Sequence, residues 1–372
     1  MRTEQGRAWI EVSRENLRHN VAVLQERLPN GCELMPVLKA DAYGHGAVMV
    51  AKELNGLGIC QFCVATAAEA VELRQGGIKG QILILGYTDP TQFVLLQQYE
   101  LTQAIIDLEY AEELDSYGGM FLVQIAVDTG MHRIGERSED VERILPMFRM
   151  ENLQIEGIFS HLCTDDSDTL ESQRYTEGQI QSFVTLLQFL EEAGYTPPAH
   201  LFSSYGVLKH PQFAFRWVRV GIALFGVVSC KEDLELAKEL RPVLSLKARV
   251  AAIKHLREGE AVGYGLQYRA VRDMRIAVVT IGYADGIPRC LSCGMGRVLL
   301  NGRSAPIVGR LCMDQMMVEV PDGCCVKRGD TAVLVGTSEQ QTTTVYDLAT
   351  QSDTITNEIL SRLGKRLNRI IV

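Results

Sequence analysis

Short apolar runs alternate with helical patterns through the first two-thirds of this chain. Several of these runs are continuous stretches of Val, Ile and Leu, which is typical of strands buried on both faces of a parallel sheet. The expected strands are Met35–Lys39, Phe62–Thr66, Gln81–Gly86, Gln103–Asp107, Leu122–Asp128, Ile155–His161, His200–Ser204 and Trp217–Gly226. Helical patterns between them include Ala67–Gln75, Ser138–Phe148 and Leu170–Ala193. Eight such repeats predict an α/β fold with a closed, TIM-type (β/α)8 barrel, whereas an open doubly wound sheet is the structural alternative.

The pattern changes near Arg241-Pro242, where strand-like runs and turn signals replace the helical patterns. The expected strands are Val243–Ile253, Ala261–Tyr268, Arg275–Ile281, Gly296–Leu300, Met316–Val320 and Thr331–Val335. This predicts a smaller, mainly β domain that ends with a helix near Val345–Leu363. We therefore expect a barrel over residues 1–238 and the second domain over residues 239–372. The first strand, about residues 1–11, is a candidate member of the second domain.

Charge and composition exclude several classes of protein. The net charge is −9 and no long run of Lys or Arg stands out, so nucleic acid and anionic membranes are not expected partners. No apolar run is long enough to span a bilayer, and the first ten residues lack the apolar core of a signal peptide. We expect a cytoplasmic protein without direct membrane insertion, which can still be the cytosolic part of a longer membrane protein.

Ten cysteines in a chain without a secretion signal are expected to be reduced thiols. Two C-x-x-C pairs occur, Cys60/Cys63 and Cys290/Cys293, but no His follows either pair at zinc-finger spacing. The first pair lies in an apolar run and the second in a Gly-rich loop. Small buried side chains are therefore the favoured interpretation, and we expect no metal site.

The segment Val37–Gly46, with the sequence VLKADAYGHG, is the strongest chemical signal in the chain. Lys39 ends the first expected barrel strand, and the carboxyl ends of barrel strands form the catalytic mouth. Its amine could form a Schiff base with an aldehyde, and the glycines that follow would let backbone approach a phosphate. From spacing alone, a solvated surface lysine is the alternative.

This segment resembles the cofactor-lysine motif of the alanine racemase family, which are fold-type III enzymes that use pyridoxal 5'-phosphate (PLP). Further motifs of that family follow in the family's order over nearly the whole chain: Arg7–Glu11, Val127–Gly135, Ile158–His161, Val218–Ile222, Val262–Gly265, Ile281–Arg289 and Gly309–Asp314. This collinearity is more specific than any single motif. The resemblance implies a PLP-dependent racemase that acts on a small amino acid.

By resemblance, Lys39 binds PLP and is one of two catalytic bases, and Tyr264 is the second base. Racemisation needs two bases, because a proton leaves one face of Cα and another arrives on the opposite face. The family's tyrosine comes from the other subunit, which implies a homodimer with shared active sites. His161 matches the histidine that hydrogen-bonds this tyrosine. Arg219 matches the arginine that faces the pyridine nitrogen of PLP. Because arginine keeps its own proton, this nitrogen stays unprotonated.

The remaining site residues are also implied by the resemblance. The cofactor phosphate would be bound by Tyr43, Ser204 and the backbone N–H groups of Gly221 and Ile222. The substrate would meet Arg133 and the backbone of Met313, with Tyr283 and Asp314 at the entrance to the site. Taken singly, each of these is an ordinary polar or apolar position.

The chain departs from the family pattern at two positions. Ala126 stands where a lysine, often carbamylated, usually supports the substrate-binding arginine, and a bound chloride is one hypothesis for its replacement. Asn357 stands where a bulky tyrosine usually crowds the substrate methyl group. Asn is smaller and offers a donor and an acceptor, so it could seat the hydroxyl of serine. This resembles the membrane-anchored serine racemases of vancomycin resistance, which supply a D-amino acid for peptidoglycan precursors.

Other functions are compatible with parts of this pattern. A plain alanine racemase would result if Asn357 is a neutral replacement. A fold-type III decarboxylase would share the barrel and Lys39, but its second-domain Cys motif finds no strong match. A PLP homeostasis protein resembles a lone barrel, which the second domain argues against. The intact Lys39 and Tyr264 pair argues against a catalytically silent sensor.

Overall fold

A computed structural model describes residues 5–210 and 215–372. By its internal packing the chain divides into two compact units. The first, here called the barrel unit, comprises Arg18–Ala42 and Ala47–Leu224, and the second, the β unit, comprises the residues up to Leu17, Tyr43–Gly46 and Phe225–Val372. Each unit is described by itself, and the domain boundary at residues 238/239 stays a prediction.

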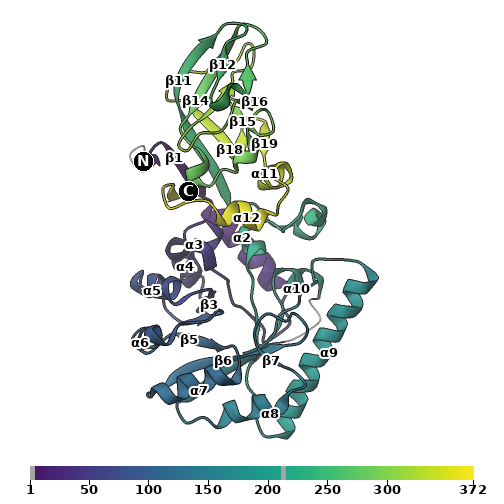
Figure 1. Cartoon of the computed structure of the whole chain (residues 1–372). Helices are drawn as coiled ribbons and strands as arrows, with labels where there is room; N and C mark the ends of the chain where they lie inside the picture. Colours follow the sequence, from purple (N-terminus) through teal and green to yellow (C-terminus); the bar gives the residue numbers. More distant parts are fainter. Residues whose placement is uncertain (1–4, 211–214) are drawn as a thin grey trace. The chain divides into compact units, whose positions relative to one another are not determined.

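The barrel unit is a ring of parallel strands surrounded by helices (Figure 1). The strands lie in the order β2, β10, β9, β8, β6, β5, β4, β3. Their bounds are β2 Glu33–Leu34, β3 Gln61–Val64, β4 Gln81–Ile84, β5 Thr102–Ile105, β6 Phe121–Asp128, β8 Leu153–Phe159, β9 Ala199–His200 and β10 Trp217–Val218, with a short β7, Glu136–Arg137, beside β6. Each of the eight expected strands overlaps one of these or its direct continuation.

The segment after β2 closes the ring. On one side the N–H groups of Met35 and Val37 donate to the carbonyls of Val218 and Val220. On the other side Leu38 N–H donates to Cys63 O, and Val37 forms a parallel bridge with Cys63. Because this segment is bonded on both edges, the sheet has no free edge there. The barrel prediction is therefore confirmed, and the open sheet is excluded.

Helices cover the outside of the ring, and α9 is the longest of those in the described part of the chain (Figure 1). Their bounds are α4 Ala47–Gly56, α5 Ala67–Gln75, α6 Phe93–Gln98, α7 Leu108–Tyr117, α8 Val141–Ile144, α9 Leu170–Glu192 and α10 Ser204–Lys209. α2, Arg14–Glu26, precedes the ring. The helix expected over Ser138–Phe148 is only partly formed. Its second half is a 3-10 turn with Pro146 near the start, and proline cannot supply the N–H of a continuing α-helix.

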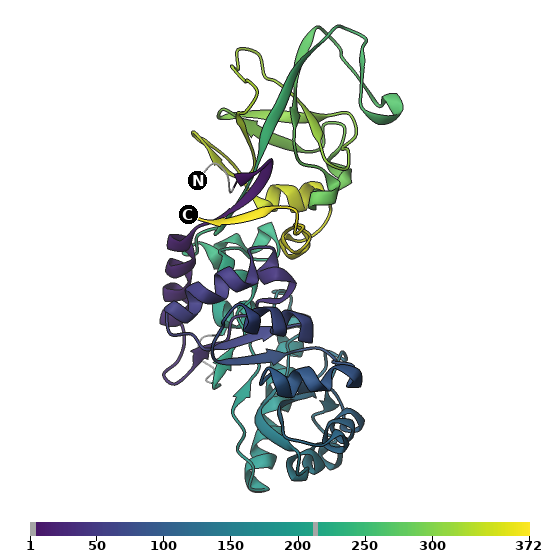
Figure 2. The ribbon, with the colours of Figure 1, turned by 90° about the vertical axis from the view of Figure 1, so that its left-hand side faces the viewer.

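The β unit is built on one long strand, β11 (Leu244–Leu256), which pairs with β1, β18 and β14. The pairing of β18 with β11 closes a ring of β11, β14, β17, β16, β15 and β18. The first strand of the chain, β1, lies between β11 and the last strand, β20 (Figure 2). The bounds are β1 Ala8–Val12, β14 Met274–Val279, β15 Arg297–Leu300, β16 Arg303–Val308, β17 Met316–Glu319, β18 Thr331–Ser338, β19 Gln341–Thr343 and β20 Asn368–Ile371.

Two expectations for the β unit are wrong in detail. The strand expected over Ala261–Tyr268 is a hairpin of β12 (Ala261–Val262) and β13 (Tyr268–Arg269), because Gly263 and Gly265 both have positive φ and reverse the chain. The helix expected over Val345–Leu363 is two helices, α11 (Val345–Gln351) and α12 (Thr356–Ser361). Asp353 breaks it with a φ of 52°. No helix in the described residues is long and apolar enough to cross a membrane.

Candidate active site

Lys39 opens a left-handed turn at the carboxyl end of the first barrel strand. In this turn, α3 (Lys39–Tyr43), the φ angles of Ala40, Asp41, Ala42 and Tyr43 lie between 52° and 55°. Such a conformation costs an L-residue about 1–2 kcal/mol. Three hydrogen bonds within the barrel unit hold it: Ala42 N–H to Leu38 O, Ala47 N–H to the Asp41 carboxylate, and Ala40 N–H to the Glu69 carboxylate.

The other expected barrel residues follow the carboxyl ends of later strands. Arg133 follows β6, His161 follows β8, Ser204 follows β9 and Arg219 follows β10. Because the strands are parallel, all of these positions lie at the same end of the barrel as Lys39. Arg219 and His161 are in direct contact, with Nη2 donating to Nδ1 at 3.2 Å. The structure thus gathers the barrel half of the expected site.

Positive charge dominates this mouth. Burial, and then the neighbouring charge of Arg133, lower the pKa of the Lys39 amine, while Glu69 acts in the opposite direction. Burial together with Arg219, Arg133 and Lys39 lowers the pKa of His161 to about 3, so this ring is neutral at physiological pH. A neutral His161 can accept one hydrogen bond and donate another, as a partner for a tyrosine hydroxyl requires.

Buried polar groups hold Arg219 in place. The hydrogen-bonded series Arg219, His200 and Gln124 is here called the relay. Its side chain is only 4% exposed and donates to the carbonyls of Ser160 and Leu201. Nη1 also donates to His200 Nδ1 at 2.5 Å, and His200 Nε2 lies 2.6 Å from Gln124 Oε1. Because arginine has only donors, His200 Nδ1 must be the acceptor, so the proton is on Nε2 and points to Gln124. Burial lowers the pKa of Arg219 to about 10, which still leaves it positive at neutral pH.

Because His200 is buried in this relay, we expect the free energy of unfolding to depend on pH. Burial and Arg219 hold the pKa of His200 well below its usual value, whereas the unfolded chain would bind a proton near pH 6.5. The free energy of unfolding should therefore fall as the pH drops below about 6.5, by up to about 1.4 kcal/mol per pH unit for this one group. Asn places an acceptor where His200 has Nδ1, so His200→Asn should remove that part of the slope. Urea titrations between pH 4.5 and 7.5, followed by Trp217 fluorescence in a Trp9→Phe background, measure it. An unchanged slope in the variant would assign the proton to another group.

The loop that carries Arg133 is ordered without the usual lysine. The Asp128 carboxylate accepts the N–H groups of Gly130 and His132 and contacts the His132 ring at 2.8 Å. Tyr175 donates its hydroxyl to Gly130 O at 2.7 Å. Ala126 is buried, and a Cβ on Gly135 would lie 2.8 Å from its backbone carbon. Arg133 itself is exposed, and within the described residues it forms no ion pair, so its guanidinium is available to an anion.

The residues expected to bind a phosphate lie at the start of α10 and in the turn that follows β10. Ser204 Oγ accepts the N–H groups of Gly221 and Ala223 at 3.0 and 3.2 Å. Both acceptor positions of the hydroxyl are then used, and its proton is free to donate. The N–H of Gly221, expected to bind phosphate, therefore already has an acceptor. Ile222 is buried, and nothing in the described part of the chain accepts its N–H.

Tyr43 and Asn357 both belong to the β unit. Tyr43 packs against Phe225, and the next glycine, Gly44, lies against α12 so closely that a Cβ there would be 2.3 Å from Leu360 O. The residue before Asn357, Thr356, anchors α12 by donating its hydroxyl to Val228 O at 2.7 Å. Asn357 is half-buried at the start of this helix.

Tyr264 and the expected entrance residues are presented on the surface of the β unit. Tyr264 stands on the turn between β12 and β13 and is 67% exposed. Tyr283 N–H donates to Cys312 O and Ala284 N–H donates to Met313 O, which ties the Tyr283 and Met313 loops together. Asp314 is paired with Arg366 at 2.5 Å. Tyr283 and Met313 are 40% and 52% exposed.

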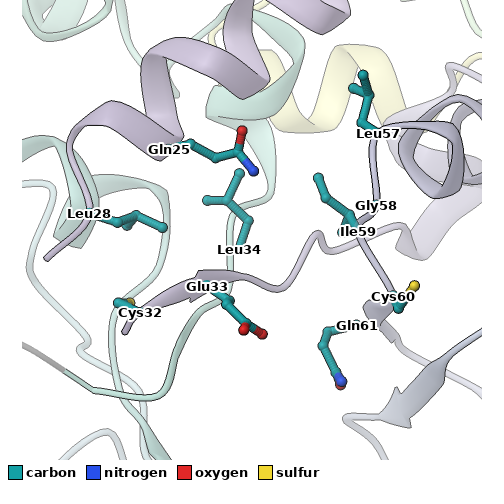
Figure 3. A pocket seen from close by; sticks show the side chains of 10 residues that line it. All are labelled: Gln25, Leu28, Cys32, Glu33, Leu34, Leu57, Gly58, Ile59, Cys60 and Gln61. Atoms are coloured by element: carbon teal, nitrogen blue, oxygen red, sulfur yellow. The ribbon is translucent and has the colours of Figure 1, made fainter. Parts of the chain in front are cut away.

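A separate pocket lies at the opposite, amino-terminal end of the barrel strands. It has a volume of about 370 Å³ and is lined by residues at the starts of β2 and β3 and by nearby helix ends (Figure 3). Cys32 and Cys60 lie on opposite sides of it, and none of the expected site residues lines it. The amino-terminal face of such barrels generally serves stability, so we assign no catalytic role to this pocket. No metal-ligating cluster of His, Cys, Asp or Glu occurs in residues 5–210 and 215–372.

Two family models together cover most of the chain. The alanine racemase N-terminal domain matches residues 12–229, and the alanine racemase C-terminal domain matches residues 243–371. The chain belongs to the alanine racemase family. This confirms the resemblance drawn from Val37–Gly46 and the motifs that follow it, and enzymes of this family are PLP-dependent racemases.

Individual relatives agree with this assignment. An amino-acid racemase of Enterococcus faecalis is 41% identical over 366 residues, which cover 98% of this chain but 51% of that protein. The chain thus spans about half the length of this relative, and the same holds for a second E. faecalis amino-acid racemase. The alanine racemase of Carboxydothermus hydrogenoformans is 38% identical and matches 98% of this chain and 99% of its own length. The structure of alanine racemase from Clostridium difficile 630 superposes with a TM-score of 0.92 at 34% identity, covering 98% of this chain and 96% of that one.

The residues of the barrel mouth fit the cofactor of this family. The N–H of Ile222 and the hydroxyl proton of Ser204, which have no acceptor among the described residues, are donors suited to a phosphate. Arg219 is a buried cation that has only hydrogen-bond donors, which suits a ring nitrogen that carries a lone pair. Lys39 has an amine with a lowered pKa, which would suit it to react with the aldehyde.

Sequence reasoning missed two positions in this mouth. His200 and Gln124 were expected only as members of buried strands, yet they fix the donors of Arg219. The available signal was polarity: a His and a Gln inside apolar barrel strands must find hydrogen-bond partners, because an unpaired buried polar group costs free energy.

Proposed function

We propose that this chain racemises small amino acids, L- and D-alanine and L- and D-serine, with PLP and two bases, Lys39 and Tyr264. The observation that carries the proposal is the buried Arg219, whose contacts with His161 and His200 place a permanent cation at the carboxyl end of the barrel beside Lys39. When bound, the cofactor supplies the aldehyde that joins the substrate amine and a ring that accepts charge from Cα.

The residues of this chain would then direct protons at Cα. Arg219 cannot give up its proton, so it keeps the ring nitrogen unprotonated and limits the charge that leaves Cα. A short-lived, localised charge favours quick reprotonation, which suits a racemase. Lys39 would take or return the proton on one face of Cα, and Tyr264 would serve the opposite face. Arg133, free of ion pairs among the described residues, would bind the substrate carboxylate.

We propose that Tyr264 acts on the site of a second copy, so that the working form is a homodimer with shared active sites. The exposure of Tyr264 supports this, because a catalytic base that is 67% exposed needs a partner surface to exclude water from it. Leu266, Met313 and Tyr283 are also apolar or aromatic side chains of the β unit that are at least 40% exposed. A surface of this kind is typical of one that is covered by another protein.

Asn357 supports serine as a substrate beside alanine. A site that hydrogen-bonds a hydroxyl can prefer it, whereas an apolar pocket rejects an added hydroxyl by only about 100-fold. We propose a serine and alanine racemase of the vancomycin-resistance type. It would act in the cytoplasm and supply D-amino acid for peptidoglycan precursors.

The substrate proposal predicts that serine is racemised at a rate at least comparable with that of alanine. Asn357→Tyr should lower kcat/KM for serine more than for alanine, by about 1–3 kcal/mol in transition-state binding, because it adds bulk and removes the amide. Asn357→Ala removes the amide without adding bulk, so it separates the two effects. Racemisation of both amino acids, followed by chiral chromatography with PLP added, measures them.

Two outcomes would change this proposal. Equal losses for both substrates in Asn357→Tyr would indicate a misplaced cofactor rather than a lost hydroxyl contact. Good turnover of alanine with negligible turnover of serine in the parent protein would leave a plain alanine racemase. Release of carbon dioxide from either amino acid would instead identify a decarboxylase.

A further inference from the structure

Glu69 links two parts of the barrel unit that lie 29 residues apart in sequence. It stands at the third position of α5, where it forms a reciprocal capping box with Thr66. One carboxylate oxygen, Oε2, accepts the N–H groups of Ala65 and Thr66 at 2.8 and 3.3 Å. The other oxygen, Oε1, accepts the N–H of Ala40 at 2.7 Å. A helix cap needs only the first set of contacts, so the second calls for another explanation.

The hydrogen bond from Ala40 to Glu69 involves the residue directly after Lys39. Ala40 is the first of the residues with positive φ in α3, a conformation that an alanine rarely adopts. A hydrogen bond from its N–H to a carboxylate is among the stronger kinds, and it fixes the peptide plane between Lys39 and Ala40. The direction in which the chain leaves Lys39 is therefore set by a side chain in the first turn of α5.

We propose that Glu69 is a positioning residue for Lys39: its second carboxylate oxygen fixes the left-handed turn from which the cofactor lysine projects. This inference rests on the proposed role of Lys39. The carboxylate also brings a negative charge near the amine, which opposes the effects of burial and of Arg133 on its protonation. Glu69 acts through Lys39 and the backbone, and it touches neither substrate nor cofactor in this proposal.

The chain contains a natural comparison for the experiment. α11 begins with a second capping box, Thr344 and Asp347, in which the shorter aspartate accepts the Thr344 N–H at 2.8 Å. Glu69→Asp would give α5 the same Thr–Asp box, so the cap and the charge remain. The side chain would be shorter by about 1.5 Å, the length of one C–C bond, and could not reach both Ala65 and Ala40. Asp347→Asn is the matched control, because it weakens a cap that contacts only Thr344 among the hydrogen bonds of the described residues.

The test uses PLP-loaded protein and two readouts. Hydrogen–deuterium exchange at the Ala40 amide should be about ten-fold faster or more in Glu69→Asp, and unchanged in Asp347→Asn. kcat should fall by about ten-fold in Glu69→Asp while KM changes by less than about two-fold, because the substrate contacts remain. Glu69→Gln keeps the length of the side chain but has one acceptor oxygen, and it should also speed exchange at Ala40.

Different outcomes identify different errors. Unchanged Ala40 exchange and unchanged kcat in both Glu69 variants would reduce Glu69 to a helix cap and overturn the proposal. Equal effects of Glu69→Asp and Asp347→Asn on kcat would do the same, since they would reflect general stability. If borohydride fixes the cofactor of the parent protein on another lysine, the proposed function itself fails, and the role of Glu69 falls with it.

Discussion

Replacing Lys39 by Ala is expected to lower racemisation by about 10⁴-fold or more, because one residue would lose both its bond to the cofactor and its role as a base. The parent protein with PLP should show a visible absorbance band that Lys39→Ala lacks. Borohydride treatment followed by peptide mass spectrometry should place the cofactor on the peptide that contains Lys39. The geometric basis is the position of Lys39 at the carboxyl end of the first barrel strand, beside Arg219 and Arg133.

Lys52 provides the control for this experiment. It is an exposed lysine on α4 in the same barrel unit, so Lys52→Ala removes an amine of the same kind without touching the mouth. It should keep the band, the label and the activity. A label on any lysine other than Lys39, or a fully active Lys39→Ala protein, would contradict the mechanism proposed above.

Replacing Tyr264 by Phe is expected to reduce kcat by about 10²–10⁴-fold while the cofactor stays bound, because only the hydroxyl that carries the proton is lost. If Tyr264 acts in the second copy, mixing Lys39→Ala and Tyr264→Phe subunits should restore activity. In each mixed dimer one site regains both bases, so random exchange should recover about a quarter of the parent activity. Racemisation assays after mixing, with subunit exchange followed by mass, measure this recovery.

Tyr117→Phe is the matched control, since Tyr117 is similarly exposed but belongs to α7 on the outside of the barrel. It should leave kcat unchanged. An absence of recovery in spite of proven exchange would mean that Tyr264 serves the site of its own chain. A Tyr264→Phe protein with normal kcat would require a different second base.

Most barrel strands could be predicted because the greater part of each is buried on both faces, and such burial requires a continuous run of apolar residues. Short buried runs such as Ile82–Ile84 carry this signal without interruption. The strand Arg303–Val308 was not predicted from the sequence, because Pro306 lies within it and proline is unusual in strands. The turn at Tyr264 was not predicted, because the strand-like pattern continues across Gly263 and Gly265. Only the positive φ angles of these two glycines in the structure show that the chain reverses there.

The candidate site also has a part that the sequence pattern predicts and a part that depends on contacts between distant residues. Lys39 could be found because it stands at a strand end inside a recognisable motif, whereas the left-handed turn behind it has no sequence pattern of its own. Ala40 and Ala42 are ordinary helix formers, so local propensity points to the wrong hand. One of the three hydrogen bonds that hold the turn comes from Glu69, 29 residues away, and single-chain patterns do not encode such pairings.

The four residues Tyr43–Gly46 pack with the β unit although they are flanked on both sides by barrel sequence. Gly44 lies against Leu360, and Tyr43 lies against Phe225, so this short insertion depends on residues encoded more than 180 positions later. The β unit in turn needs β1 from the start of the chain to stand between β11 and β20. The protein is therefore not modular in the genetic sense. A chimera with a relative that joins the two coding regions at a single crossover near residue 224 would combine mismatched partners at β1 and at Tyr43–Gly46, and a functional recombinant would have to exchange all three segments together.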